Sequence, residues 1–174
     1  MVMASPTITA KSLIMLAIVA LVCAVDQTAK AFALSHFSTD SPTHVAGPLY
    51  FTKLVDHASS ISYLPQYSWP LETLRLTLII ALAALGIASA LTRVRILCAV
   101  VIGGIVGNTL DRWTHPVFSV VDFIKVGNLA VFNVADVATA VGIVGLAVCF
   151  VPFVTRPLDV IRQPKSPEPQ ALGV

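Results

Sequence analysis

Charged residues are scarce in this chain. Only 11% of its 174 residues are Asp, Glu, Lys or Arg, whereas 56% are hydrophobic. A soluble domain usually carries about a quarter charged residues, so this chain lacks the polar surface that water requires. Its apolar residues are therefore expected to face lipid. The net charge of +2 is too small to indicate nucleic-acid binding, and the sequence contains neither a Gly-rich phosphate loop nor a basic-aromatic patch.

Clusters of metal-binding side chains are also absent from the sequence. The three cysteines, Cys23, Cys98 and Cys149, lie inside apolar runs, where cysteine behaves as a small hydrophobic residue. No C-x-x-C pair or Cys/His cluster is present, and the four histidines are scattered through polar connections without ligand spacing. We therefore expect no metal site.

Long apolar runs dominate what is present. Four of them approach the roughly 20 residues that a helix needs to cross a bilayer, at about residues 12–32, 74–91, 94–110 and 134–154. The sequence thus predicts a mainly α, polytopic membrane protein with four transmembrane helices in a single domain, residues 1–155. The polar, Pro-rich tail, residues 156–174, is expected to be disordered. A cleaved signal peptide is the alternative for the first run, but no small-residue cleavage pattern follows it.

The distribution of basic residues predicts an orientation. Lys and Arg are retained on the cytoplasmic side of membrane proteins, and an even number of spans places both termini on the same side. The short connection between the second and third spans carries Arg93 and Arg95. Both termini and the tail are therefore predicted to be cytoplasmic.

The connection between the first two spans, residues 35–69, has a β-strand pattern. Tyr50, Thr52, Leu54 and Asp56 alternate with Phe51, Lys53 and Val55, which is typical of a strand. We expect a small extracytoplasmic β-sheet that rests on the bilayer. Its boundaries are expected at four prolines, Pro42, Pro48, Pro65 and Pro70.

Two acidic residues, Asp122 and Asp136, flank a mostly apolar segment with thirteen residues between them. The segment is predicted to leave the third span, turn at residues 127–128 and return into the fourth. Asp136 would then lie in the first turn of a helix, where the helix dipole favours an anion, and Asn133 would be the N-cap. Each acid alone could serve only to cap a helix or end a loop.

As a pair, the two acids have a specific chemistry. Ionisable residues in membrane segments are energetically costly and usually functional. Neighbouring carboxylates share a proton, so that one can activate water while the other polarises a carbonyl group. Asp122 and Asp136 are therefore candidate catalytic residues for aspartic proteolysis.

Two further pairs of polar residues have helical i,i+4 spacing. Asp26 and Lys30 can form an ion pair on one helix face, which could be purely structural. Asn108 and Arg112 also share a face, and Arg112 could bind a carboxylate or a substrate carbonyl. The preceding G-x-x-x-G, residues 103–107, is expected to let two helices pack closely.

Four blocks of the sequence resemble the lipoprotein signal peptidases, or signal peptidase II. They are DQTAK (26–30), GGIVGNTLDRW (103–113), VVDFI (120–124) and FNVADVATAVG (132–142), in the order and spacing of that family, and the resemblance covers about residues 12–155. It implies that Asp122 and Asp136 are catalytic. It further implies substrate binding by Asn108, Arg112 and Asn133, and a supporting role for Asp26, Lys30 and Asp111.

The resemblance also implies a reaction and a location. Members of the family are aspartic endopeptidases of the bacterial cytoplasmic (inner) membrane, with the active site near the outer face. They remove the signal peptide of a prolipoprotein just before a diacylglyceryl-modified cysteine, without a metal or organic cofactor. The expected partners are prolipoproteins, membrane lipid and globomycin-like inhibitors, but no nucleic acid.

One block departs from the family pattern. The family has an Asn-x-Gly-x-Ala-Phe-like stretch in the first outer loop, whereas this chain has VDHASS at 55–60, with Asp56 for Asn and Ala58 for Gly. The change predicts altered contacts with substrate and inhibitor. Two alternatives remain: a catalytically inactive paralogue that binds lipopeptides, and a small proton-coupled carrier. The carrier would need polar residues through the whole membrane, and the second and fourth spans are almost wholly apolar.

Overall fold

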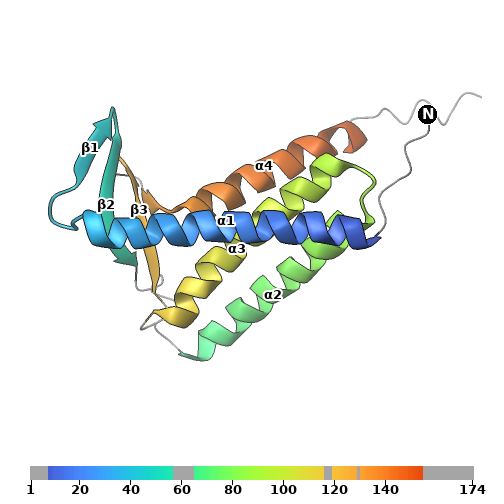
Figure 1. Cartoon of the computed structure of the whole chain (residues 1–174), viewed down its shortest axis with the longest axis horizontal. Coiled ribbons are helices and arrows are strands. Elements are labelled where there is room, and N and C mark those ends of the chain that lie inside the picture. The colour runs from blue at the N-terminus through green and yellow to red at the C-terminus, as the bar shows by residue number, and fades with distance from the viewer. Residues whose placement is uncertain (1–7, 57–64, 116–118, 129, 155–174) are drawn as a thin grey trace, which may run out of the picture.

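Four helices and four strands form the structure, a computed structural model that describes residues 8–56, 65–115, 119–128 and 130–154 (Figure 1). Along the chain they are α1 (Ile8–His36), β1 (Thr43–Ala46), β2 (Leu49–Asp56), α2 (Pro65–Ala88), α3 (Thr92–Thr114), β3 (Val120–Val126), β4 (Ala130–Phe132) and α4 (Val134–Val154). All four helices are long and apolar enough to cross a membrane. The predicted mainly helical architecture with a small sheet is confirmed.

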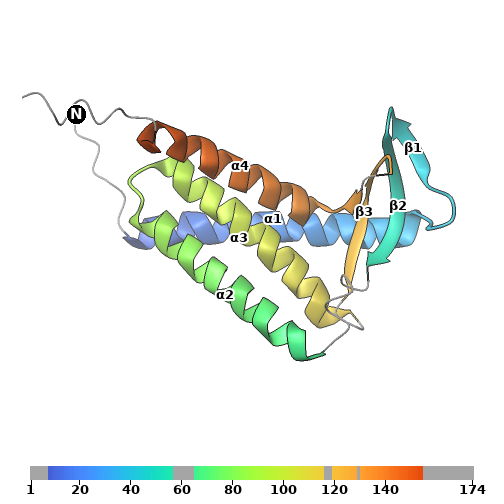
Figure 2. The same ribbon diagram turned by 180° about the vertical axis from the view of Figure 1, so that it is seen from behind.

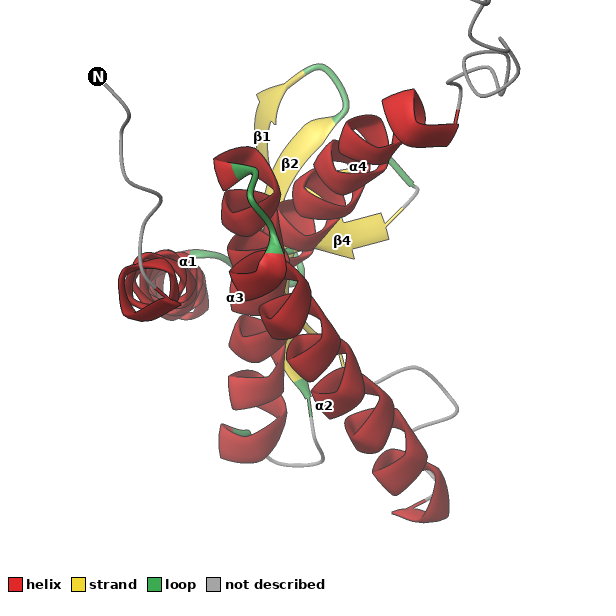
Figure 3. Ribbon diagram, turned by 90° about the vertical axis from the view of Figure 1, so that its right-hand side faces the viewer, coloured by secondary structure: helices red, strands yellow, loops and turns green. Residues whose placement is uncertain are grey.

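Helix α3 is the centre of the bundle. It packs against each of the other three helices, and the view along the bundle shows α1 on one side of it and α2 and α4 on the other (Figure 3). In the most apolar 18-residue stretch of α3, 56% is buried inside the protein, whereas the corresponding share in the other helices is at most 22%. The outward faces of α1, α2 and α4 carry large exposed apolar side chains, such as Leu16, Leu76 and Val148. These three helices therefore present the surface that faces lipid.

Glycines allow the close approach of α1 and α4 to α3. A Cβ atom added to Gly103 would lie 2.7 Å from Cβ of Val22 on α1, and one added to Gly107 would lie 2.9 Å from Oδ2 of Asp26. On the other side, a Cβ atom at Gly104 would lie 2.4 Å from the carbonyl oxygen of Ala135 on α4. The predicted packing role of the G-x-x-x-G is confirmed, and the glycine between its ends serves a second helix.

The sheet lies across one end of the bundle, here called the sheet end (Figure 2). Its strands are antiparallel and follow the order β1-β2-β3-β4. The sequence pattern predicted the strand at 49–56, and the turn predicted at 127–128 is present, with Gly127 at φ +53°. The pairing of that strand with β3, which sets Leu54 opposite Asp122, was not predicted. The opposite end of the bundle holds the start of α1, the end of α4 and the α2–α3 connection (Figure 1).

The start of α2 differs from the expectation. The sequence predicted a span from about residue 74 and loop boundaries at Pro65 and Pro70, whereas α2 begins at Pro65 and contains Pro70. Pro65 is the first helical residue, where its missing N–H would have had no intrahelical partner. Pro70 is the sixth residue and costs the helix one hydrogen bond. Of the two departures from the family pattern, Asp56 ends β2, whereas Ala58 and the tail at 156–174 lie outside the described residues.

The glycine packing predicts a selective loss of stability. Gly104→Ala should lower the free energy of unfolding by roughly 2 kcal/mol, because overpacking a tight contact forces the backbone to move. Gly86→Ala is the matched control, because its Cβ atom would meet the flexible end of Met15 instead of backbone. Thermal unfolding of the purified protein in detergent measures both; equal melting temperatures for the two variants would contradict the prediction.

Candidate active site

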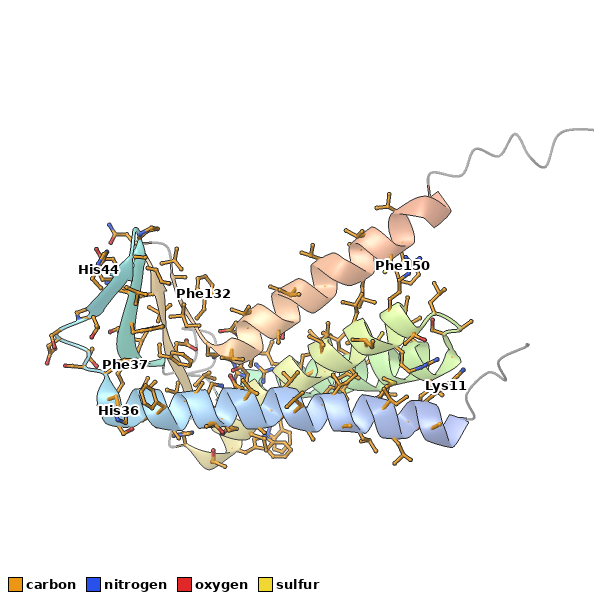
Figure 4. The ribbon with its side chains drawn as sticks, turned by 45° about the horizontal axis from the view of Figure 1, so that its top comes forward. Lys11, His36, Phe37, His44, Phe132 and Phe150 are labelled. Carbon is orange, nitrogen blue, oxygen red and sulfur yellow. The ribbon has the colours of Figure 1, made fainter. Side chains whose placement is uncertain are left out.

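Asp122 and Asp136 approach the same residue, Asn133, at the sheet end of the bundle. Asp122 lies in β3 and Asp136 in the first turn of α4. Nδ2 of Asn133 donates to Oδ1 of Asp122 at 2.6 Å, and the backbone N–H of Asn133 donates to Oδ2 of Asp136 at 3.1 Å. Asn133 is fully buried and Asp122 is 8% exposed. Figure 4 labels Phe132, which precedes Asn133 at the junction of β4 and α4. The chain thus brings both acids into hydrogen bonds with one asparagine.

Helix capping places Asn133 and Asp136. Oδ1 of Asn133 accepts the backbone N–H of Asp136 at 2.9 Å, which confirms the predicted N-cap. Asp136 returns the interaction by accepting the backbone N–H of Asn133. This reciprocal arrangement is the capping box. The start of α4 therefore holds both side chains in position while leaving Nδ2 of Asn133 directed at Asp122.

Asn108, on α3, is the second link between the acids. Its Nδ2 donates to Oδ1 of Asp136 at 2.8 Å, and its Oδ1 accepts Nδ2 of Asn133 at 3.0 Å. Nζ of Lys30 also donates to Oδ1 of Asn108, at 2.9 Å. A flipped amide would direct its N–H₂ group at the ammonium of Lys30 and its oxygen at the carboxylate of Asp136. Lys30 therefore determines which way the Asn108 amide points.

Lys30 is itself held between two carboxylates. Its Nζ lies 2.7 Å from Oδ2 of Asp26 and 3.0 Å from Oδ2 of Asp111. Lys30 is 2% exposed, and Asp26 and Asp111 are fully buried. A charged side chain at such a site is stable only when it is paired. We call these three residues the ionic triad; the predicted Asp26–Lys30 pair is confirmed and extended by Asp111.

The ionic triad also holds the backbone beside each candidate catalytic acid. Oδ2 of Asp111 accepts the N–H of Val121 at 3.1 Å, the residue before Asp122. Oδ1 of Asp26 accepts the N–H of Ala135 at 2.8 Å, the residue before Asp136. Each carboxylate of the triad thus fixes the chain one residue from one acid.

Gln27 is part of this network, although the sequence reading assigned it no role. Its Nε2 donates to Oδ1 of Asp111 at 2.8 Å and to the carbonyl oxygen of Gly107 at 3.2 Å. The sequence signal for this role was an amide side chain next to Asp26 in an otherwise apolar run. Gln27 supplies Asp111 with a donor that Lys30 does not provide.

Arg112 lies beside the acids in a groove between α2, α3 and α4. The groove has a volume of about 470 Å³. It is lined by the polar side chains of Asn108, Arg112, Asp136, Arg75 and Thr139 and by the apolar Leu74, Leu78, Ile105, Ala140 and Ile143. Nη1 of Arg112 donates to the carbonyl oxygen of Asn108 at 3.1 Å. Arg75, which forms an ion pair with Glu72, was missed by the sequence reading, although a charged residue in an apolar span is a signal.

All eight predicted site residues lie at the sheet end. Seven form one hydrogen-bonded network: Asp26, Lys30, Asn108, Asp111, Asp122, Asn133 and Asp136. Arg112 adjoins them through the backbone of Asn108. Within the part of the chain that the structure describes, no group of three His, Cys, Asp or Glu side chains is arranged to hold a metal ion.

Comparison with known proteins assigns the chain to a family. The family model for signal peptidase (SPase) II matches residues 18–152, a range that includes the whole network. The chain belongs to the signal peptidase II family. It is therefore a peptidase, and the four apolar helices make it a multi-pass bacterial membrane protein.

Individual relatives agree with this assignment. The chain is 32% identical over 124 residues to the lipoprotein signal peptidase of Syntrophomonas wolfei, which covers 70% of this chain and 82% of the relative. Two solved structures of bacterial membrane enzymes, determined by the in meso method at 1.9 and 2.3 Å resolution, share the fold with a TM-score of 0.70 each. The first is 20% identical and covers 79% of this chain and 92% of that chain; the second is 19% identical and covers 88% and 94%.

The ionic triad predicts a large effect of removing its single cation. Lys30→Met should reduce the free energy of unfolding by about 3–5 kcal/mol, because it leaves two buried carboxylates without a counter-charge. The triple variant Lys30→Met, Asp26→Asn, Asp111→Asn should unfold less readily than the single variant, since no uncompensated charge remains. Denaturant or thermal unfolding in detergent measures both. A triple variant less stable than Lys30→Met would show that charge balance is not the dominant contribution.

Proposed function

We propose that this peptidase is an intramembrane aspartic endopeptidase, which removes signal peptides from prolipoproteins just before a diacylglyceryl-modified cysteine. Membership of the signal peptidase II family supports the substrate class. The observation that supports the aspartic mechanism is the joint attachment of Asp122 and Asp136 to Asn133. Of the two acids, Asp136 also lines the groove between α2, α3 and α4.

In the proposed reaction the two acids share one proton. The ionised aspartate takes a proton from a water molecule, which attacks the carbonyl carbon of the scissile peptide bond. The protonated aspartate donates a hydrogen bond to the carbonyl oxygen and stabilises the charge that develops there. The proton taken from water then passes to the leaving nitrogen. Asn108 and Asn133 hold the two carboxylates in a fixed relation through these steps, so little reorganisation is required.

The groove between α2, α3 and α4 is the proposed site of the signal peptide. Its walls combine apolar side chains with the polar groups of Asn108 and Arg112. An apolar signal helix could enter from the bilayer and lie against Leu78 and Ile143, while Arg112 and Arg75 donate hydrogen bonds to peptide carbonyls near the cleavage site. Globomycin-like inhibitors are expected to occupy the same groove.

The proposed location is the bacterial cytoplasmic membrane, with both termini cytoplasmic. Arg93 lies in the first turn of α3, next to the α2–α3 connection at the end of the bundle opposite the sheet, and basic residues favour the cytoplasmic side. The active site at the sheet end would then lie near the outer face. Cleavage there would leave the mature protein attached by its lipid at the outer face of the membrane.

An inactive paralogue that binds lipopeptides is the second candidate, favoured by the departures at Asp56 and Ala58. The complete network around the two acids favours the enzyme. A proton-coupled carrier has little support, because the long apolar faces of α2 and α4 offer no polar path away from the sheet end.

The mechanism predicts that each acid is required for cleavage. Asp122→Asn and Asp136→Asn should each reduce the rate of prolipoprotein cleavage by at least about a thousandfold, because an amide can neither accept the proton of water nor share one. The measurement is gel-based cleavage of a diacylglyceryl-modified precursor by the purified protein.

Asp40→Asn is the matched control, because Asp40 is an exposed acid in the connection between α1 and β1 and should leave the rate unchanged. Unchanged melting temperatures would separate lost chemistry from lost folding. A wild-type rate in either active-site variant would refute the dyad, and a wild-type protein that binds but does not cleave the precursor would establish the inactive paralogue.

A further inference from the structure

A second cavity lies beside the acids, on the α1 side of the molecule. It has a volume of about 560 Å³, within the roughly 300–1,000 Å³ typical of ligand pockets. Its lining consists of one face of α1, the chain just after it, and strands β2 and β3: Ala24, Val25, Thr28, Ala29, Phe32, Phe37, Phe51 and Phe123. We call it the aromatic pocket.

The aromatic pocket and the acids share the same structural walls. Phe123 of the pocket follows Asp122 in β3, and successive side chains of a strand point to opposite faces. On α1, Ala29 of the pocket precedes Lys30 of the ionic triad. The pocket is therefore separated from the catalytic network by one strand and one helix.

Four aromatic rings give the pocket a defined shape. Phe37 stacks on Phe51 with ring centroids 5.1 Å apart and meets Phe32 edge to face at 5.8 Å. Figure 4 shows Phe37 between the end of α1 and the strands. These contacts join the end of α1 to the sheet, so the pocket has walls from both.

The lining offers almost no hydrogen-bonding group. Thr28 is its one polar side chain, and Oγ1 of Thr28 donates to the carbonyl oxygen of Ala24 at 2.6 Å. An extended peptide segment in this pocket would leave backbone amides unpaired, at a cost of about 1–3 kcal/mol each. The groove on the other side of the acids, by contrast, presents Asn108 and Arg112. The aromatic pocket therefore suits a hydrocarbon chain, and the groove suits a peptide.

We propose that the aromatic pocket binds an acyl chain of the diacylglyceryl group on the substrate cysteine. This inference rests on the proposed function, in which the scissile bond joins a peptide half to a lipid-bearing half. The groove lies on the α2 side of the acids and would hold the peptide half. The aromatic pocket lies on the α1 side and would hold the lipid-bearing half. A lipid tail in the bilayer is already in an apolar environment, so the hydrophobic effect adds little binding free energy when the tail enters the pocket. Its contribution is to orient the modified cysteine for attack.

Filling the pocket tests this assignment through its dependence on acyl-chain length. Ala29→Trp should lower kcat/KM about tenfold for a precursor peptide that carries long acyl chains, and much less for the same peptide with short chains that do not reach the pocket. Leu21→Trp is the matched control on the same helix, because Leu21 is 64% exposed and lines neither cavity; it should leave both rates unchanged. Equal losses on the two substrates, or no loss on either, would overturn the proposal.

A binding experiment separates this proposal from the proposed function. The probe is a precursor peptide with a photoreactive acyl chain, added to the Asp122→Asn, Asp136→Asn double variant. Crosslinks to residues 24–37 support the proposal, and crosslinks to groove residues of α2 or α4 overturn it. Equal labelling of residues 24–37 by free photoreactive diacylglycerol, without competition from unlabelled precursor, would also overturn it by showing a general lipid site. If the wild type cleaves no precursor while the probe still labels 24–37, the proposed function fails and the pocket assignment stands.

Discussion

The charge balance around Lys30 is the constraint on which the rest of the structure depends. One ammonium group is buried between the carboxylates of Asp26 and Asp111, which join α1 to α3. The same two carboxylates accept the N–H groups of Val121 and Ala135, one residue before each candidate catalytic acid. A buried charge without a partner is strongly destabilising, so the three side chains hold one arrangement. That arrangement determines where β3 and α4 present Asp122 and Asp136.

Asparagines between the acids follow from the same electrostatic argument. A third carboxylate in place of Asn108 or Asn133 would repel both acids, and a second cation would neutralise the negative charge on which the chemistry depends. An amide carries no net charge and still provides donors and an acceptor. Lys30 orients the amide of Asn108 and the capping box orients that of Asn133, so both direct N–H groups at carboxylates. In a membrane, where water cannot replace a lost partner, each of these hydrogen bonds matters more.

Sequence reasoning recovered those parts of the structure that depend on local pattern. Apolar runs predicted the four helices, the i,i+4 spacing predicted the Asp26–Lys30 pair, and Asn133 before an apolar run predicted the N-cap. It failed where partners come from distant parts of the chain. The pairing of β2 with β3 joins two connections with no local signal for each other, and Asp111 reaches Lys30 only because glycines bring α1 against α3. The early start of α2 at Pro65 was missed because proline fits a first helical turn as well as a loop.

The β2–β3 pairing links the end of β2 to the strand that carries the candidate catalytic Asp122. Leu54 is opposite Asp122, and Asp56 is opposite Val120, so the chain that continues from Asp56 starts beside the strand that carries an acid. We therefore expect a substitution at Asp56 to act through the position of β3. Asp122 has a second constraint, because Asp111 holds the N–H of Val121 from the helical side. The strand is thus held from both sides, by β2 and by α3.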